Sequence, residues 1–269
     1  MTDRSPKSAE RESGRIKSVE IGYRVLLAVQ LGPGSVRLSD VARRASLSGG
    51  AAHNYLVSLV RTGLVEQDGR GRYRLGPSAF ALSLASFRQL NGFDVLRGEA
   101  NALRQLTSQT ISVGVWSQAG PVSIYMQRGT DKEALEFRPG LFPLLSSGAG
   151  AIFVAHLPEQ DTRDVIAREL KELDSKRSRQ EALSSVRDAV SPKGYARMDH
   201  KDSPGFTLST PVWGIDGHIQ FTLSILIHNH IEPDVEARWL HELFASSHRA
   251  SLLLSDSDFV GYSPGLAGR

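Results

Sequence analysis

The stretch LSDVARRASLSGGAAHNYLVSLVR, residues 38–61, decides the fold of the N-terminal part of this chain. Its apolar residues recur at the three- and four-residue spacing of a helix face, first at Val41, Ala42 and Ala45 and then at Ala52, Leu56, Leu59 and Val60. Ser39 and Ser48 precede these runs, where a hydroxyl can accept a hydrogen bond from a free amide, so we expect each to cap a helix. Ser46-Leu47-Ser48 supplies a tight turn. The stretch therefore predicts a helix-turn-helix.

The sequence on either side extends this motif. Ser18 is a suitable N-cap for a preceding helix that runs to about Leu31, and Gly32-Pro33-Gly34 ends that helix. Residues 64–66 and 72–75 read as two short strands around a glycine-rich, charged tip. Three helices followed by a β-hairpin are the element order of a winged helix-turn-helix, which we place at residues 18–76. Residues 1–17 are polar with mixed charge, and we expect them to form a disordered tail.

The rest of the chain changes from a helical to an alternating pattern. Pro77 opens a linker helix, placed at residues 77–91, and a second helix follows at about 95–107. From Thr110 the period is two, and strands are expected at about 111–116, 122–127, 135–138, 206–212 and 219–227. Later helices are expected at about 150–157, 161–173, 180–190 and 233–254. The pattern predicts an α+β domain at 92–255, with an antiparallel sheet flanked by helices, and a flexible tail at 256–269.

Charge is distributed unevenly along the 269 residues. Residues 1–75 hold 13 Lys+Arg and 7 Asp+Glu, a formal charge of +6, whereas the remainder holds 19 and 22, a charge of −3. A basic first quarter on an acidic remainder favours a nucleic-acid-binding module joined to another domain, over a basic tail that is merely solvated. The chain has no cysteine, which excludes a disulfide scaffold, a cysteine nucleophile, an iron–sulfur cluster and a Cys-ligated zinc site.

The uncharged segment PGLFPLLSSGAGAIFVAHLP, residues 139–158, has the length of a membrane span. Its three prolines, three glycines and His156 argue against a span. They favour a loop, a small-residue helix entry and a short buried helix. Because the N-terminus also lacks an apolar signal region, we expect a cytoplasmic protein without membrane association.

Several short segments carry a family resemblance by their shared order and spacing. In the first domain they are SVEIGYRVL (18–26), LSDVA (38–42), AH (52–53), GLVE (63–66) and GRYRLG (71–76). In the second they are KGYA (193–196), Gly205, TPV (210–212) and DG (216–217). Over about 18–255 the chain thus resembles the IclR family of bacterial transcriptional regulators. The resemblance implies a DNA-binding winged helix-turn-helix, a linker helix, a GAF-like effector-binding domain, and a homodimer or dimer of dimers on a palindromic operator of double-stranded DNA.

The third helix of the first domain is the expected recognition helix. The candidate DNA-binding residues are Arg43, Arg44, Ser48, Gly49, Gly50, His53, Asn54, Arg70 and Arg72. Asn54 is suited to bidentate hydrogen bonding with adenine, and the arginines are suited to phosphates or the minor groove. The chain departs from the family at Gly49-Gly50-Ala51, where Arg and Ser or Thr are common, so direct readout from this turn is reduced. Two interpretations of the glycine pair stay open: close approach of backbone amides to a phosphate, or only a looser helix.

The second domain is expected, by the resemblance, to bind a small-molecule effector. The candidate residues are Trp116, Tyr125, Ser146, Ser147, Gly148, Ala149, Met198, Leu208, Ser224 and Leu226, with Phe137 as a further aromatic wall. Residues 146–150 offer hydroxyls and helix amides to an anionic group. Of four positions that are polar in the family, only Ser224 is polar here, so we expect a small, partly apolar or aromatic acid. The alternative is that these residues fill a closed core that binds no ligand.

Other chemistry has less support in the sequence. His228-Asn229-His230 can place two imidazoles on one strand face, but no third ligand is near, so we interpret them as exposed loop histidines and expect no metal. No GxSxG, Walker A or GxGxxG motif occurs, and we expect neither enzymatic activity nor a cofactor. A small-molecule-processing enzyme and a DNA-binding protein without effector response remain alternatives. Phe80, Leu84 and Phe87 cannot all be buried in one winged domain, which predicts that the linker helix pairs subunits.

Overall fold

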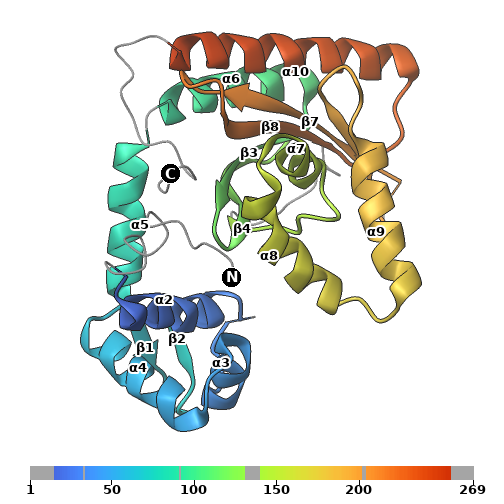
Figure 1. Cartoon of the computed structure of the whole chain (residues 1–269). Helices are drawn as coiled ribbons and strands as arrows, with labels where there is room; N and C mark the ends of the chain where they lie inside the picture. Colours follow the sequence, from blue (N-terminus) through green and yellow to red (C-terminus); the bar gives the residue numbers. More distant parts are fainter. Residues whose placement is uncertain (1–14, 33, 91, 131–139, 202–203, 256–269) are drawn as a thin grey trace, which may run out of the picture. The chain divides into compact units, whose positions relative to one another are not determined.

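The computed structural model describes residues 15–32, 34–90, 92–130, 140–201 and 204–255. The chain divides into two compact units, residues 1–88 and 89–269, and each is described by itself. Figure 1 labels their helices and most of their strands. Residues 1–14 and 256–269 of the two predicted tails, and the strand expected at 135–138, lie outside the described residues.

The described part of the first unit contains three helices, a hairpin and then the linker helix, as predicted. Its elements are α2 (Lys17–Gln30), α3 (Leu38–Ala45), α4 (Gly49–Arg61), β1 (Val65–Gln67), β2 (Tyr73–Leu75) and α5 (Pro77–Gln89). Val25, Val41 and Leu56 are fully buried where the three helices meet. Val36 exchanges two backbone hydrogen bonds of 2.8 Å with Tyr73, which ties the hairpin to the chain just before α3.

The turn between α3 and α4 is closed by two serines with different backbone conformations. Ser48 caps α4, because its Oγ accepts a hydrogen bond from the Ala51 amide at 3.3 Å, as predicted. Ser46 ends α3 in the left-handed region with φ 55°, a conformation that glycine adopts without steric cost.

The predictions that Ser18 and Ser39 cap helices are wrong. Helices α2 and α3 begin two residues earlier than caps at these serines require, so both serines lie within a first turn. The cap positions are occupied by Ile16 and Arg37, and neither side chain makes a capping hydrogen bond. In α3 the earlier start places Leu38 against the hydrophobic core, a contact that outweighs the loss of a serine cap.

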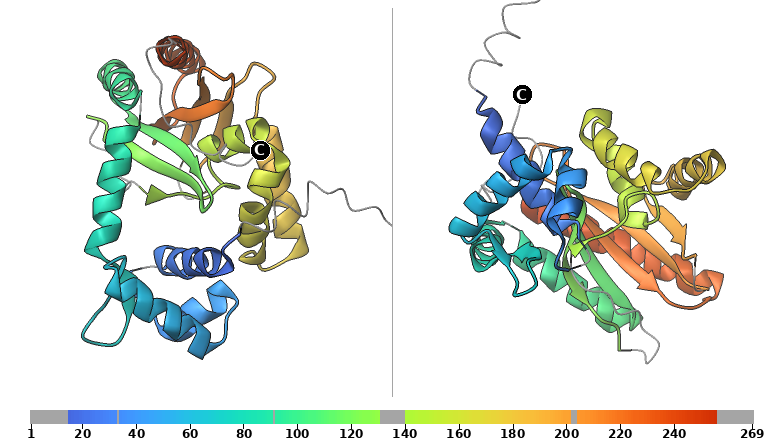
Figure 2. Two further views of the ribbon diagram at one scale, coloured as in Figure 1. Left: turned by 60° about the vertical axis from the view of Figure 1, so that its left-hand side comes forward. Right: turned by 90° about the horizontal axis from the view of Figure 1, so that it is seen from below.

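The second unit is an antiparallel six-stranded sheet between two layers of helices, which confirms the predicted α+β class. The strand order is β5-β4-β3-β8-β7-β6, with β3 (Thr110–Ser117), β4 (Gly120–Gln127), β5 (Gly140–Leu141), β6 (Ala196–Asp199), β7 (Phe206–Trp213) and β8 (Ile219–Ile227). Helices α6 (Phe93–Thr107) and α10 (Pro233–Leu254) cover one face. Helices α7 (Gly148–His156), α8 (Glu159–Lys171) and α9 (Lys176–Ala189) lie on the other (Figure 2).

The sequence did not indicate β5 or β6, the two edge strands. Strand β5 has only two residues, too few for a periodic signal. Strand β6 alternates buried Ala196 and Met198 with Arg197 and Asp199, and the two charged side chains resemble those of a loop. Both edges are short, which limits pairing with other chains.

The segment 139–158 behaves as its small residues predict. Its described part contains β5, a loop and α7, of which residues 148–153 are buried. None of the helices in the described ranges is both long enough and apolar enough to cross a membrane.

We predict opposite effects of two substitutions in the turn between α3 and α4. Ser46→Gly relieves the left-handed conformation and stabilises the motif by up to ~1 kcal/mol, whereas Ser48→Ala removes a cap and destabilises it by ~1 kcal/mol. Hydrogen exchange of the α3 and α4 amides in the full chain measures both. Faster exchange in Ser46→Gly would contradict the assigned strain, and unchanged exchange in Ser48→Ala would contradict the cap.

Candidate functional site

Helix α4 presents a polar face that is free of the core. Ala52 and Leu56 are fully buried, whereas His53 and Asn54 are exposed, as expected for the outward face of a recognition helix. A Cβ added at Gly49 or Gly50 would meet no atom within 4 Å, so space does not require glycine at either position. Open backbone at the start of a capped helix leaves its first amides accessible to an anion.

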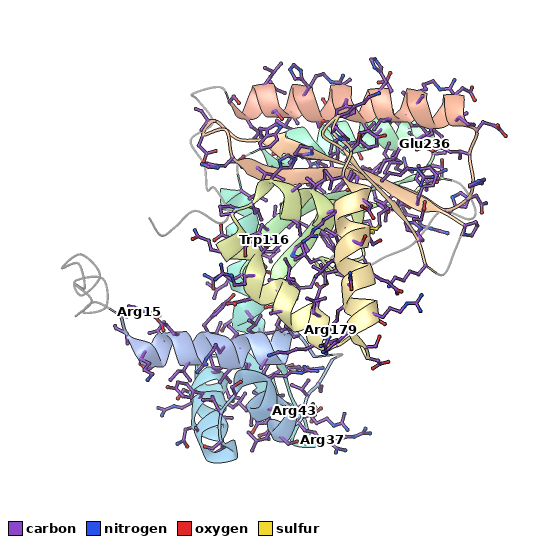
Figure 3. All side chains as sticks on the ribbon, turned by 45° about the vertical axis from the view of Figure 1, so that its right-hand side comes forward. Arg15, Arg37, Arg43, Trp116, Arg179 and Glu236 are labelled. Atoms are coloured by element: carbon purple, nitrogen blue, oxygen red, sulfur yellow. The ribbon has the colours of Figure 1, made fainter. Side chains whose placement is uncertain are left out.

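The two arginines of α3 differ in what they contact. Arg43 pairs with Asp40 at 2.9 Å, but its side chain is 75% exposed, so this pair constrains it little. Arg44 instead turns back and donates a hydrogen bond to the Ala28 carbonyl of α2 at 3.3 Å. Arg37, which was not among the candidates, extends outward beside Arg43 at the same end of the unit (Figure 3). All three arginines are exposed, but only Arg44 is tied to the backbone of α2, so the structure favours Arg37 and Arg43 as the cations that can reach outward.

The tip of the hairpin is shaped by one aspartate. Asp68 Oδ1 accepts hydrogen bonds from the amides of Arg70 and Arg72, both at 2.9 Å. The Arg72 amide, followed by that of Arg70, lowers the pKa of the exposed Asp68 carboxyl. Gly71 follows with φ 74°, which completes the turn. Arg70 is exposed and has no ion pair among the described residues, whereas Arg72 is half-buried.

In the second unit, a carboxylate holds the loop that leads into α7. Glu169 of α8 accepts hydrogen bonds from the amides of Leu144 and Leu145, at 2.7 and 2.9 Å. Ser147 donates to the Pro143 carbonyl at 2.6 Å and caps α7 by accepting from the Gly150 amide at 3.0 Å. These contacts fix the start of α7, and helix geometry leaves the amides of residues 148 and 149 without an acceptor inside the helix.

The start of α7 lies against a face of the sheet that carries hydroxyl groups. A Cβ added to Gly148 would lie 2.8 Å from Ser209 Oγ, so only a glycine permits this approach. The hydroxyls on this face include those of Ser112, Ser123, Thr207, Ser209, Thr222 and Ser224. The opposite face, towards α6 and α10, is built from apolar residues such as Phe221, Leu223 and Ile225. The sheet therefore has one apolar face and one face rich in hydroxyls.

Most hydroxyls of this face are paired with one another or with a neighbour. Ser209 and Ser224 lie 2.8 Å apart, and Ser112 and Ser123 lie 2.9 Å apart. Thr207 Oγ1 lies 2.8 Å from Nε2 of His200. Burial lowers the pKa of His200, opposed by the charge of Asp199, which favours the neutral imidazole.

The structure brings together eight of the ten predicted effector-binding residues and separates two. Trp116, Met198, Ser224 and Leu226 are on the hydroxyl-bearing face, and residues 146–149 form the loop and first turn of α7 above it. Leu208 and Tyr125 do not belong with them. Leu208 is fully buried against the apolar face, and Tyr125 packs edge-on against Phe93 of α6 with a ring distance of 5.8 Å. Phe137 is outside the described residues.

Because Leu208 faces the other side of the sheet, the region beneath α7 has a different polarity from the one expected. Its neighbours Thr207 and Ser209 point to the opposite face and bring two hydroxyls to the region beneath α7. The alternation of hydroxyl residues in FTLST, residues 206–210, is the signal that could have revealed them. The site is therefore more polar than the sequence suggested.

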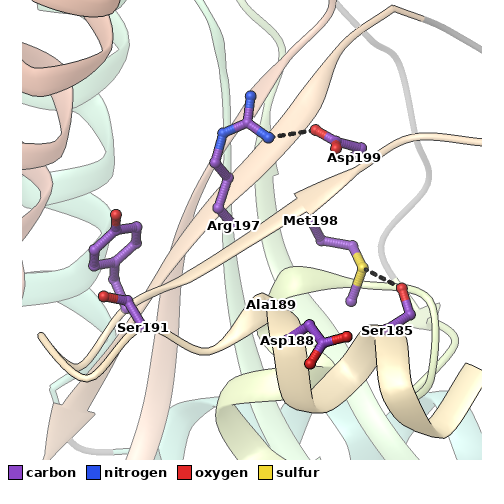
Figure 4. Close-up of a pocket in the computed structure, with 8 residues that line it drawn as sticks. Ser185, Asp188, Ala189, Ser191, Arg197, Met198 and Asp199 are labelled. Carbon is purple, nitrogen blue, oxygen red and sulfur yellow. Dashed lines mark hydrogen bonds and ion pairs between the residues drawn. The ribbon is translucent and has the colours of Figure 1, made fainter.

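A separate open hollow of about 490 Å³ lies beside the edge strand β6 and helix α9 (Figure 4). Its cation, Arg197, is already engaged by Asp199, by Glu236 at 2.9 Å, and by the Phe206 ring at 3.9 Å. Because this guanidinium is neutralised within the protein, the hollow is a poor anion site.

Two histidines of the second unit, His228 and His156, pack against other side chains of the fold. His228 is buried, and its Nδ1 lies 2.9 Å from Gln109 Oε1, so the expectation that it is an exposed loop residue is wrong; His230 is exposed. His156 packs edge-on against Trp213 with ring centroids 5.0 Å apart, and burial lowers its pKa. Within the described ranges, no group of three or more His, Cys, Asp or Glu is placed to hold a metal ion.

Comparison with known proteins identifies relatives of both units. Residues 18–69 match the family model of the IclR helix-turn-helix domain. The transcriptional repressor IclR of Escherichia coli is 24% identical over 160 residues, and the match spans 58% of each chain. An IclR-family transcriptional regulator from Brucella abortus has the same fold, with a TM-score of 0.74, 16% identity, and coverage of 93% of this chain and 96% of that one. An IclR homologue of Microbacterium hydrocarbonoxydans, complexed with 4-hydroxybenzoate, has a TM-score of 0.56 and 18% identity, over 87% and 99% of the two chains.

We predict that Glu169 stabilises the second unit through the two loop amides. Glu169→Ala leaves two partly buried amides without their acceptor and lowers the free energy of unfolding by about 1–3 kcal/mol. Denaturant unfolding followed by fluorescence reports on this unit, because Trp116, Trp213 and Trp239 all lie in it. Glu172→Ala, at the exposed residue that follows α8, is the control and should change stability by less than ~0.5 kcal/mol. Equal effects of the two variants would contradict the assigned role.

Proposed function

We propose that this chain, which is similar to transcriptional regulators of the IclR family, is a DNA-binding regulator whose operator affinity changes when a small organic acid binds its second unit. The observation that carries the proposal is the combination of an exposed, basic helix-turn-helix with a buried, hydroxyl-bearing site under a helix N-terminus. The regulator acts by binding alone, without catalysis, in the cytoplasm.

Each element of the first unit has a proposed role on DNA. Helix α4 enters the major groove, where Asn54 reads an adenine and His53 contacts a neighbouring base or phosphate. Arg43 and Arg70 contact phosphates or the minor groove on either side, joined by Arg37. Ser48 and Gly49-Gly50 bring the first amides of α4 to a phosphate. We assign Arg44 to holding α2 against α3 instead, because its guanidinium contacts the Ala28 carbonyl.

The second unit is proposed to bind a carboxylic acid with an aromatic or partly apolar body. The amides of residues 148 and 149 and the hydroxyls beneath them bind the carboxylate, with the helix dipole adding to the attraction. Trp116 and Phe142 supply an apolar wall. The 4-hydroxybenzoate complex of the Microbacterium homologue supports an acid of this size, and we choose 4-hydroxybenzoate as the first probe.

Subunit pairing is proposed through α5, the linker helix. Its Phe80, Leu82 and Leu84 side chains are 67%, 61% and 46% exposed, and water-exposed apolar groups in a row favour a contact with a second copy. A two-fold homodimer presents two copies of α4 and therefore recognises a palindromic operator.

Selection of bound duplexes from a random pool, with and without 4-hydroxybenzoate, tests the proposal on the purified full chain. We expect an inverted repeat to be enriched and the acid to change its affinity. Binding without enrichment of any sequence would contradict the role of α4, and an enriched operator insensitive to every small acid would contradict the effector role.

We predict that Arg70→Ala weakens binding to operator and random DNA by the same factor. Loss of one phosphate contact lowers the slope of log K against log salt by about one. Fluorescence anisotropy titrations at several salt concentrations measure it, with Arg163→Ala on α8 as an exposed control that should change nothing. A loss confined to the operator would assign Arg70 to base recognition instead.

We predict that Asn54→Ala flattens sequence preference. Loss of a bidentate adenine contact weakens operator binding by about 1–3 kcal/mol and leaves random-DNA binding unchanged. The same titrations with an operator that carries a substitution at the contacted base pair complete a double-mutant cycle. If the variant retains the wild-type preference at every base pair, adenine is read by another residue.

A further inference from the structure

The hydroxyl of Thr222 differs from the others on its face of the sheet. Thr222 is fully buried, and its Oγ1 has no hydrogen-bond partner among the described residues. A buried hydroxyl without a partner lowers stability, and valine has nearly the same shape without that cost. The presence of threonine rather than valine at position 222 is therefore not explained by the stability of the fold, and a bound molecule is one partner that would explain it.

The neighbours of Thr222 explain why it lacks a partner. Across the sheet it is flanked by Gly114 of β3 and Pro211 of β7, which carry no polar side chain. Two residues further along β8, Ser224 is flanked by Ser112 and Ser209 and bonds to Ser209. On this face, the hydroxyl of Ser224 therefore has a hydrogen-bond partner within the sheet, whereas the hydroxyl of Thr222 has none among the described residues.

Gly114 also lets this hydroxyl lie close against the backbone of β3. A Cβ added there would lie 2.5 Å from Thr222 Oγ1 and 3.3 Å from the Phe142 ring. Any larger residue at position 114 would displace the Thr222 hydroxyl and press on the Phe142 ring. Glycine at position 114 therefore allows the Phe142 ring and the Thr222 hydroxyl to lie next to each other.

The distance from Thr222 to the start of α7 suits a small ring. Thr222 lies two residues along β8 from Ser224, about 6.6 Å, and Ser209 lies one strand away, about 4.8 Å. Gly148 sits directly over Ser209, so the α7 amides and the Thr222 hydroxyl are separated by about 8 Å at the level of the sheet. An acid whose carboxylate meets those amides can reach Thr222 with a substituent at the opposite end of a six-membered ring.

We propose that Thr222 is a recognition residue of the effector site, whose hydroxyl hydrogen-bonds an oxygen substituent of the acid at the end opposite its carboxylate. This proposal rests on the proposed function and narrows it: the effector is a hydroxy- or oxo-substituted acid. The Phe142 ring borders the same region and packs against the ring of the ligand. An acid without the oxygen leaves the hydroxyl unpaired and binds more weakly.

Calorimetric titration of the full-length wild type and Thr222→Val with benzoate and with 4-hydroxybenzoate tests the proposal. The wild type should bind 4-hydroxybenzoate about tenfold more tightly than benzoate, and Thr222→Val should lose this preference without losing benzoate affinity. Thr210→Val is the matched control, since Thr210 is equally buried but points to the apolar face, and it should retain the preference.

Thermal unfolding without ligand separates recognition from a structural role. Thr222→Val should melt at or above the wild-type temperature, because no internal hydrogen bond is lost. A melting temperature lower than that of Thr210→Val would overturn the proposal, as would a preference that Thr222→Val retains. If acids bind and the preference survives, only the role of Thr222 fails; if neither acid binds the wild type, the proposed effector class fails with it.

Discussion

A sheet covered by helices on both faces buries most of the side chains that it carries, and this constraint shapes the whole second unit. Buried polar groups need partners, so a face with hydroxyls is stable only where they pair. The pairs Ser209–Ser224 and Ser112–Ser123 meet this requirement, and the apolar residues facing α6 and α10 avoid it. Thr222 is the exception that points to a ligand.

The same constraint explains how the start of α7 is held. A helix N-terminus buried against a sheet brings unpaired amides into the interior. Ser147 satisfies one of them, and Glu169 satisfies two amides of the preceding loop. Two amides at the first turn are left for an anion, next to the hydroxyl-bearing face. The need to pair buried backbone amides therefore explains both how the start of α7 is held in place and why two of its amides can bind an anion.

The sequence predicted the element order well and the site less well, for identifiable reasons. The spacing of apolar residues revealed the helices, whereas of the three serine caps expected in the first unit only Ser48 is a cap in the structure. Tyr125 was placed on the wrong face because β3 and β4 pair with a bulge near Val113 and Gly114, and one extra residue reverses the facing of those that follow. The unpaired state of Thr222 depends on Gly114 and Pro211, which lie far from it in sequence. Cross-strand neighbours of this kind cannot be inferred from a local pattern.

Hydrogen exchange of the full chain, compared with and without saturating 4-hydroxybenzoate, tests the central claim most directly. The claim is that an organic acid binds between the start of α7 and the hydroxyl-bearing face. We predict slower exchange in residues 144–151 and 222–226, with β6 and α9 beside the open hollow unchanged. Protection confined to β6 and α9, or no protection anywhere, would contradict the account.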